Sequence, residues 1–316
     1  MKKTKLFFID YASFDNSGSY IDKIKSNINK DIDYHFFLHS AYKFNSLNST
    51  RIFNKISDKI NFKKLNNISK FFEMYLSFTY IYLRLLFNFH LEKKVIVSLY
   101  QPFTAYSFFF KLVKILNAEL YIIVHDLIPL ESNYPKFILS SQNSLLQKAD
   151  KFIVHNEHSR DGLIKFNKKI YLIRFPLMEI EKNISLTTKK TSIINFLFIG
   201  HLRKEKGIEL LLDVWRKFSV KHDSVYLTIA GSIANGLNFN FDNLQKCEII
   251  DGYIDDAKYS QLIQNCDYGI LPYTGGTNSG VFSTIISFNK PVLSSDISLF
   301  KDSEFSIDEL MFGSGN

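Results

Sequence analysis

A glycine-bounded cationic turn has residue types and spacing that suit a diphosphate. It starts at Gly200, ends at Gly207, and carries Arg203 and Lys206 three residues apart. Glycine lets the backbone turn tightly after an apolar run that ends at Ile199. A forked guanidinium beside a mobile ammonium is a good diphosphate ligand, whereas a solvated basic turn would explain the same residues without any ligand. The turn matches neither a Walker loop nor a dinucleotide-binding fingerprint.

A polar segment at residues 272–280 has the composition of an anion-binding loop. It is rich in Gly, Thr and Ser, and an apolar pattern typical of a helix follows it. The free N–H groups and the positive dipole end of a helix start attract anions, and the hydroxyls of Thr277 and Ser279 could add donors. A plain loop with Ser279 as a helix cap is the alternative.

A histidine–aspartate pair, His125 and Asp126, directly follows an apolar strand pattern. A carboxylate beside an imidazole fixes the tautomer and raises the basicity of the ring, so the pair is a candidate catalytic group. A structural histidine that caps a backbone group is the alternative. His155 and His158 are interpreted as turn and helix-start residues and not as a metal pair, and the sequence has no cysteine–histidine spacing typical of a structural zinc site.

Short apolar segments alternate with helical patterns along most of the chain, and these elements must position the residues above. Helical patterns occur, for instance, at residues 208–218 and 258–266. The predicted strands are residues 6–9, 34–38, 95–99, 120–124, 152–154, 171–173, 194–199, 225–229, 248–250, 268–271 and 292–293. This alternation is typical of parallel sheets covered on both faces, in which ligands bind beyond the carboxyl ends of the strands.

Charge and glycine content divide the chain into two parts. Up to residue 180 the balance is +11, from 26 cationic and 15 anionic residues, whereas the remainder has 13 and 16 and a balance of −3. Eleven of the 13 glycines lie after residue 195. Residues 179–192 lack periodicity and form the best linker candidate. We therefore predict two doubly wound domains, residues 1–178 and 179–316.

Residues 195–296 resemble a known glycosyltransferase pattern in both order and spacing. The matching segments are residues 198–207 with G-x-[IL]-R-x-x-K-G, residues 252–254 and 267–273 with "GYI … aD … lPY", and residues 279–280 and 287–292 with "SG … SFGxPV". The chain therefore resembles a GT-B-fold glycosyltransferase close to family 4 of the retaining enzymes (glycosyl transferases group 1). The resemblance implies an α/β protein with two Rossmann-like domains that face a cleft.

The resemblance also implies a nucleotide-diphosphate sugar as the donor substrate, held mainly by the C-terminal domain, with no metal and no other cofactor. The implied diphosphate ligands are Gly200, Arg203, Lys206, Ser279, Gly280 and Val281. The implied sugar or base contacts are Gly18, Tyr253, Ile254, Tyr273, Thr277, Asn278 and Thr284. By the same resemblance, His125 would lie beside the donor sugar, and Asp126 would orient its ring or approach the acceptor.

The sequence departs from the family at several points. Many relatives carry two glutamates flanking the helix start, the second of which contacts the ribose, and Gly276 and Thr284 stand at these positions here. Asn289 replaces a usual glycine. Relatives usually continue past the strand at residues 292–293 with further helices, so we expect the C-terminal domain to be truncated or abbreviated in this chain.

A basic amphipathic region, residues 51–70, precedes the most apolar stretch of the chain, residues 71–89. Its cations are Arg51, Lys55, Lys59, Lys63, Lys64 and Lys70. In the apolar stretch, helical spacing gathers Glu73, Ser77, Arg84 and Asn88 on one narrow polar stripe. The uncharged run is too short to span a bilayer, but basic amphipathic helices with aromatic residues lie on anionic membranes. A buried helix with a solvated basic face is the alternative.

These features predict a cytoplasmic hexosyltransferase. If the basic amphipathic region binds a membrane, the enzyme would be peripheral on the inner membrane face. The apolar run after the basic start is too short for a signal peptide, and two cysteines suit a reducing compartment. The acceptor would be a carbohydrate or a lipid-linked glycan in polysaccharide, capsule or lipopolysaccharide assembly. The alternative is a catalytically silent GT-B-like partner that binds glycan or stabilises an active transferase. We expect no nucleic-acid partner, because the helices carry no reading motif.

Overall fold

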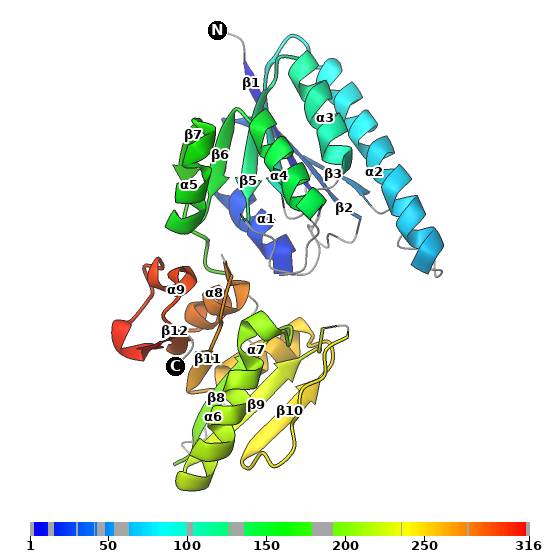
Figure 1. The fold of residues 1–316 in the computed structure, drawn as a ribbon. Helices are drawn as coiled ribbons and strands as arrows, with labels where there is room; N and C mark the ends of the chain where they lie inside the picture. Colours follow the sequence, from blue (N-terminus) through cyan, green and yellow to red (C-terminus); the bar gives the residue numbers. More distant parts are fainter. Residues whose placement is uncertain are drawn as a thin grey trace. The chain divides into compact units, whose positions relative to one another are not determined.

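Two compact α/β units make up the protein, Met1–Arg174 (the first unit) and Phe175–Asn316 (the second unit) (Figure 1). The computed structural model describes residues 3–11, 16–29, 31–40, 42, 48–53, 63–99, 104–125, 127, 136–178, 192–234, 236–276 and 278–313. The division between the units lies four residues before the boundary expected at 178/179. Residues 179–191, most of the expected linker, lie outside the described residues.

The first unit is built on a parallel sheet of seven strands in the order β3-β2-β1-β4-β5-β6-β7. Its strands are β1 (Thr4–Asp10), β2 (Asp33–His39), β3 (Ser49–Phe53), β4 (Glu92–Leu99), β5 (Glu119–Val124), β6 (Lys151–Val154) and β7 (Lys169–Leu172). Its helices are α1 (Asn16–Asn27), α2 (Lys63–Leu86), α3 (Thr104–Ile115), α4 (Lys136–Lys148), α5 (Glu157–Leu163) and the 3-10 turn η2 (Ile164–Phe166).

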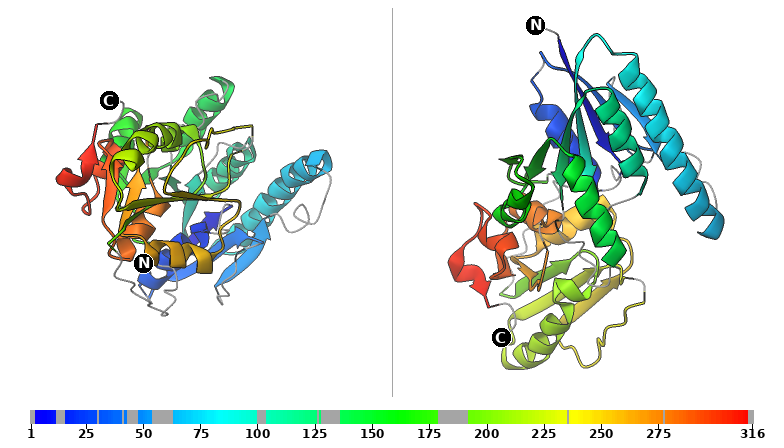
Figure 2. Two further views of the ribbon diagram at one scale, coloured as in Figure 1. Left: turned by 90° about the horizontal axis from the view of Figure 1, so that it is seen from below. Right: turned by 45° about the horizontal axis from the view of Figure 1, so that its top comes forward.

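The winding direction of this sheet reverses between β1 and β4. The chain runs outward from β1 to β3, then returns to β4 on the other side of β1 and continues to β7. Right-handed crossovers therefore put α1 on one face of the sheet and α3 and α4 on the other. Helices α2, α3 and α4 lie side by side (Figures 1 and 2).

Helix α2 turns part of the expected polar stripe toward the protein. Glu73 and Ser77 are buried, and the Ser77 hydroxyl donates to the Ile52 carbonyl over 3.3 Å. Phe72 and Leu76 are instead 61% and 68% exposed. The outer face of α2 is thus apolar, because the helix is hydrophobic on nearly all sides and Phe78 and its neighbours take the core-facing positions. Among the described residues, no helix is long and apolar enough to cross a membrane.

The basic helix expected from Arg51 onward is wrong at its start, because Ser49–Phe53 is the edge strand β3. Phe53 is fully buried with its ring 5.7 Å from that of Phe78, so core packing overrides the four-residue spacing of the cations. Lys55 and Lys59 lie outside the described residues.

The second unit is a parallel sheet of six strands in the order β10-β9-β8-β11-β12-β13. Its strands are β8 (Ile194–Ile199), β9 (Val225–Gly231), β10 (Cys247–Asp251), β11 (Tyr268–Leu271), β12 (Val292–Ser295) and β13 (Met311–Phe312). Its helices are η3 (Lys204–Lys206), α6 (Ile208–Lys221), α7 (Asp256–Asn265), α8 (Gly280–Ser287), α9 (Ser298–Lys301) and η4 (Asp308–Leu310). The winding direction reverses between β8 and β11, which makes the carboxyl edge of this pair the favoured ligand position.

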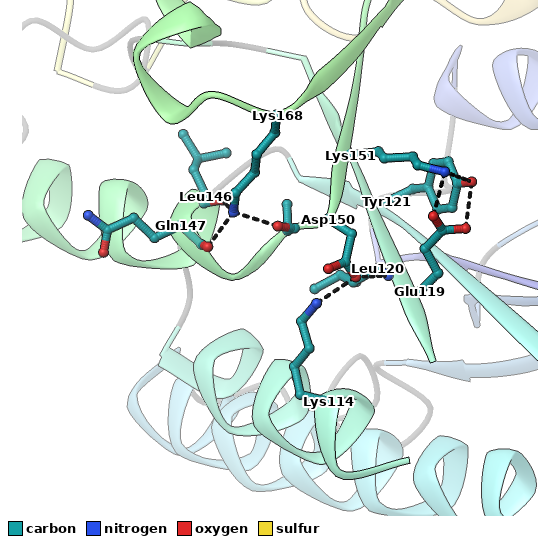
Figure 3. Close-up of polar contacts among 10 residues, drawn as sticks. Lys114, Glu119, Leu120, Tyr121, Leu146, Gln147, Asp150, Lys151 and Lys168 are labelled. Atoms are coloured by element: carbon teal, nitrogen blue, oxygen red, sulfur yellow. Dashed lines mark hydrogen bonds and ion pairs between the residues drawn. The ribbon is translucent and has the colours of Figure 1, made fainter. Parts of the chain in front are cut away.

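Polar contacts tie helices to the amino-terminal edge of the first sheet (Figure 3). The Lys168 ammonium donates to the carbonyls of Leu146, Gln147 and Ala149 at the end of α4. The Asp150 carboxylate accepts from the Lys114 ammonium over 2.5 Å and from the Leu120 N–H over 2.7 Å.

A cation that donates to several carbonyls at the carboxyl end of a helix satisfies oxygens that have no partner within the helix. Its charge also offsets the helix dipole.

We expect Lys168→Met to destabilise the first unit by about 1 kcal/mol, because the last carbonyls of α4 lose their cationic donor. Calorimetry should show a melting temperature about 2–4 °C lower for this unit. Lys165→Met is the control, since Lys165 is exposed three residues earlier and its loss should cost less than about 0.5 kcal/mol. Equal losses in the two variants would contradict this role of Lys168.

Candidate functional site

The two segments that the sequence singles out meet at the carboxyl edge of β8 and β11. The Thr274 N–H donates to the Glu205 carbonyl over 3.0 Å, which joins the segment after β11 to the turn after β8. Gly207 has φ +69°, and a Cβ there would lie 1.7 Å from the Pro272 carbonyl oxygen. The turn can approach Pro272 this closely only because position 207 is glycine.

Two further glycines bring the turn against β9 and the start of α8. Gly200 has φ +122°, and a Cβ there would lie 3.2 Å from a methyl group of Val281. Gly231 ends β9 with φ +140°, and a Cβ there would lie 1.9 Å from the Gly200 carbonyl oxygen. Backbone therefore fills the space that side chains would otherwise occupy, and the candidate ligands Gly200 and Val281 lie next to each other.

The two cations of the turn have different supports. The Lys206 ammonium lies 3.8 Å from the centroid of the Tyr273 ring, a cation–π contact. Tyr273 is 1% exposed, with its ring 5.4 Å from that of Phe300. Its ring therefore contacts Lys206 from the core and is not available to stack on a sugar or base. The Arg203 guanidinium lies 3.6 Å from the Glu205 carboxylate at the surface, a weak pairing that an anionic ligand can replace.

Helix α8 presents its amino terminus to this edge. The Ser279 side chain accepts the Phe282 N–H over 3.2 Å and so caps the helix. The first amides, those of Gly280 and Val281, have no acceptor inside a helix and are the natural anion ligands. Thr284 is buried, and its hydroxyl donates to the Gly280 carbonyl over 2.8 Å within the helix.

The rear of α8 is bonded to the chain that enters the second unit. The Ser283 hydroxyl donates to the Pro176 carbonyl over 2.6 Å and accepts the Met178 N–H over 2.8 Å. The Ser287 hydroxyl donates to the Met178 carbonyl over 3.0 Å. These bonds fix the helix whose amino terminus faces the candidate site.

The expected base-binding segment follows β10 at the same edge of the sheet. Gly252 has φ +118°, and Tyr253 after it is 72% exposed, which leaves its ring open for stacking. Ile254 and Asn278 are half-buried. Thr277 lies outside the described residues.

His201 is a candidate that the sequence reasoning missed. It is exposed directly after Gly200, and its Nδ1 lies 3.0 Å from the Ser232 hydroxyl at the end of β9. Its place beside the motif glycine was the available signal, because any residue there must lie at the carboxyl edge of β8.

In the first unit, His125 follows β5 and is buried against two other rings. Its ring centroid lies 5.4 Å from that of Tyr20 in helix α1 and 5.4 Å from that of His155, which follows β6. Burial and the neighbouring His155 hold the pKa of His125 well below its usual range. Gly18 lies in the first turn of α1, two residues before Tyr20, and Asp126 lies outside the described residues.

His155 and His158, which the sequence predicted as turn and helix-start residues, lie in different surroundings. His158 is exposed in α5, a helix capped by the Asn156 side chain, which accepts the Ser159 N–H over 2.7 Å. His155 is buried beside His125, a contact that could not be predicted from the sequence. Among the described residues, no group of three or more histidine, cysteine or acidic side chains could hold a metal ion.

Residues 194–310 match the family described as glycosyl transferases group 1. Similar solved structures include Anabaena HepE in complex with UDP and glucose, at TM-score 0.65 and 13% identity, covering 99% of this chain and 86% of that one. The E. coli trehalose-6-phosphate structure bound with UDP-2-fluoro glucose has TM-score 0.63 and 11% identity, covering 98% and 88%. The N-terminal domain of Candida albicans trehalose-6-phosphate phosphatase has TM-score 0.62 and 11% identity, covering 94% and 83%. No curated protein matches the chain.

At identities of 11–13%, the solved structures show only that the fold is shared. They confirm the predicted α/β architecture of two doubly wound units, and the family match covers most of the second unit, including both segments that meet at β8 and β11.

Proposed function

We propose that this chain is a group 1 glycosyltransferase, the family matched by residues 194–310, and that it transfers a hexose from a UDP-hexose donor to a carbohydrate or lipid-linked acceptor. The second unit binds the donor and the first unit the acceptor, with retention of the anomeric configuration, in the assembly of a cell-surface polysaccharide. The observation that carries the proposal is the meeting of two cations and a helix amino terminus where the sheet reverses direction.

The donor diphosphate lies between the turn after β8 and the start of α8. Arg203 and Lys206 supply charge, and the amides of Gly280 and Val281 supply fixed dipoles. When the bond from the sugar to UDP breaks, negative charge grows on the diphosphate, and these preorganised groups stabilise it without reorganisation. Uridine is the base to test first, because the similar Anabaena and E. coli structures hold UDP or a UDP sugar.

His125 is proposed to position the donor sugar, as the family resemblance implies. A neutral imidazole can donate one hydrogen bond and accept another, which suits the positioning of sugar hydroxyls. Glycosyl transfer builds positive charge on the sugar, so a neutral ring there is also preferable to a cationic one. Burial of His125 favours that neutral form.

We further propose that the outer face of α2 rests on an anionic membrane. This face is defined by Phe72, Leu76 and Leu83, and Phe87 and Phe89 extend it beyond the helix end. Such a contiguous exposed apolar surface marks an interaction site. The excess of cations in the first part of the chain favours an anionic lipid surface, where a lipid-linked acceptor would be found.

The donor site predicts the effect of removing its two cations. Bound UDP at a hundred times its dissociation constant should stabilise the wild-type protein by about 2.7 kcal/mol in thermal unfolding. Arg203→Ala with Lys206→Ala should weaken UDP binding at least about a hundredfold, because two charge-assisted contacts are lost. Lys204→Ala is the control, since Lys204 is an exposed cation of the same turn.

Unchanged UDP binding in the double variant would contradict this donor site. UDP binding by the wild type with no transfer or donor hydrolysis on any acceptor would favour the silent-partner alternative.

Retention is open to a direct test. The product of a UDP-hexose reaction should carry the anomeric configuration of the donor, and the coupling constant of its anomeric proton in an NMR spectrum reports this. The product of an early time point is the sample to use, so that donor hydrolysis does not contribute. An inverted product would exclude the retaining assignment.

The membrane proposal predicts flotation with anionic vesicles. Changing Phe72, Leu76 and Leu83 together to Ser should lower vesicle binding about tenfold or more, because three apolar side chains no longer enter the interface. The control changes Val214 and Val220 to Ser, two exposed apolar residues of α6 in the second unit. Equal vesicle binding by the α2 variant and wild type would rule out this surface.

A further inference from the structure

Three buried rings from separate parts of the first unit form one cluster. Tyr20 comes from α1, His125 follows β5 and His155 follows β6, and their centroids lie 5.4–5.5 Å from one another. The His155 Nδ1 lies 2.7 Å from the Ile173 carbonyl oxygen just after β7, and its Nε2 lies 3.0 Å from the Tyr20 hydroxyl. The cluster therefore joins the carboxyl edges of three neighbouring strands to α1.

The chemistry of these partners fixes where the protons lie. A carbonyl oxygen only accepts hydrogen bonds, so the Nδ1 of His155 must carry a proton. In a neutral ring Nε2 is then the acceptor, and the Tyr20 hydroxyl donates to it. Burial raises the pKa of the Tyr20 phenol, with the Asp10 carboxylate of β1 adding to the effect, so that phenol keeps its proton.

The same arrangement opposes a second proton, and so a positive charge, on either histidine. Burial lowers the pKa of His155 and of His125, and each positive charge would repel a charge on the other ring. The Ile173 carbonyl favours a charged His155, whereas the Tyr20 O–H directed at Nε2 favours the neutral ring. Among the described residues, Asp10 of β1 acts on the Tyr20 phenol of α1, and His155, which follows β6, acts on His125.

We propose that Tyr20 and His155 are positioning residues that hold the His125 imidazole neutral and fixed in orientation at the carboxyl edge of the first sheet. The use of that ring toward a donor sugar rests on the proposed function. Neither Tyr20 nor His155 needs to touch substrate for this role, because they act through contacts with His125 and with each other.

The test is Tyr20→Phe, which removes one hydroxyl and keeps the ring. Without the donor at Nε2, the pKa of His155 rises, so it gains its proton at a higher pH and places a charge beside His125. The loss of kcat at acidic pH should therefore occur about half to one pH unit higher than in wild type, with KM for the UDP sugar unchanged. Tyr171→Phe in β7 of the same unit is the control and should leave the pH profile unchanged.

A second measurement does not need activity. In protein labelled with 15N-histidine, two-bond proton–nitrogen correlations should show His155 as the Nδ1–H tautomer between about pH 5 and pH 8. In Tyr20→Phe, His155 should titrate at a higher pH than in wild type, and His125 at a lower pH, because a charged His155 repels a second charge on His125.

An Nε2–H tautomer or a charged His155 at neutral pH in wild type would overturn the proposal, as would unchanged histidine titrations in Tyr20→Phe. If wild type transfers no UDP sugar, the proposed function fails, and the histidine titrations alone then decide whether this cluster holds His125 as stated.

Discussion

The close approach of backbone to backbone at the end of β8 is the constraint on which the candidate donor site depends. Gly200, Gly207 and Gly231 each occupy a positive φ, and a side chain at any of them would collide with or crowd a neighbouring segment. Their absence of side chains lets the turn after β8 lie against β9, Pro272 and α8 together. The cations of the turn and the amides of α8 can act on one ligand only because this packing brings their segments to the same edge of the sheet.

The fold was predictable where burial on both faces of a sheet leaves a continuous apolar run. Residues 194–199 and 268–271 were predicted with the bounds of β8 and β11, which lie in the middle of their sheet. Strand β3 was missed because it is short, lies at an edge and carries a cation within a helix-like spacing. The orientation of α2 was not predictable either, since a helix that is apolar on nearly all sides gives no signal for the face that is buried.

The candidate site divides in the same way between local and distant information. The segments around Gly200 and Gly280 are recognisable because their residues are close in sequence and follow predicted strands. The contact of Tyr20 with His155 joins residues 135 positions apart and depends on the order of strands in the sheet. Tyr273 and Thr284 fall on motif positions, yet their side chains serve Lys206 and the backbone of α8, which only packing could reveal.

Tyr253, a proposed base contact, lies where a change of side chain should have little effect on stability. Its side chain is largely open to solvent and follows a glycine at the end of an edge strand, so the core does not depend on it. Exchanges at such a position usually change folding free energy by less than about 0.5 kcal/mol. Gly200, Gly207 and Gly231 tolerate no such change, because a side chain there would crowd neighbouring backbone or side-chain atoms. Under the proposed function, base or sugar preference could change during evolution while diphosphate binding is retained, because the two properties would reside in residues with opposite tolerance to mutation.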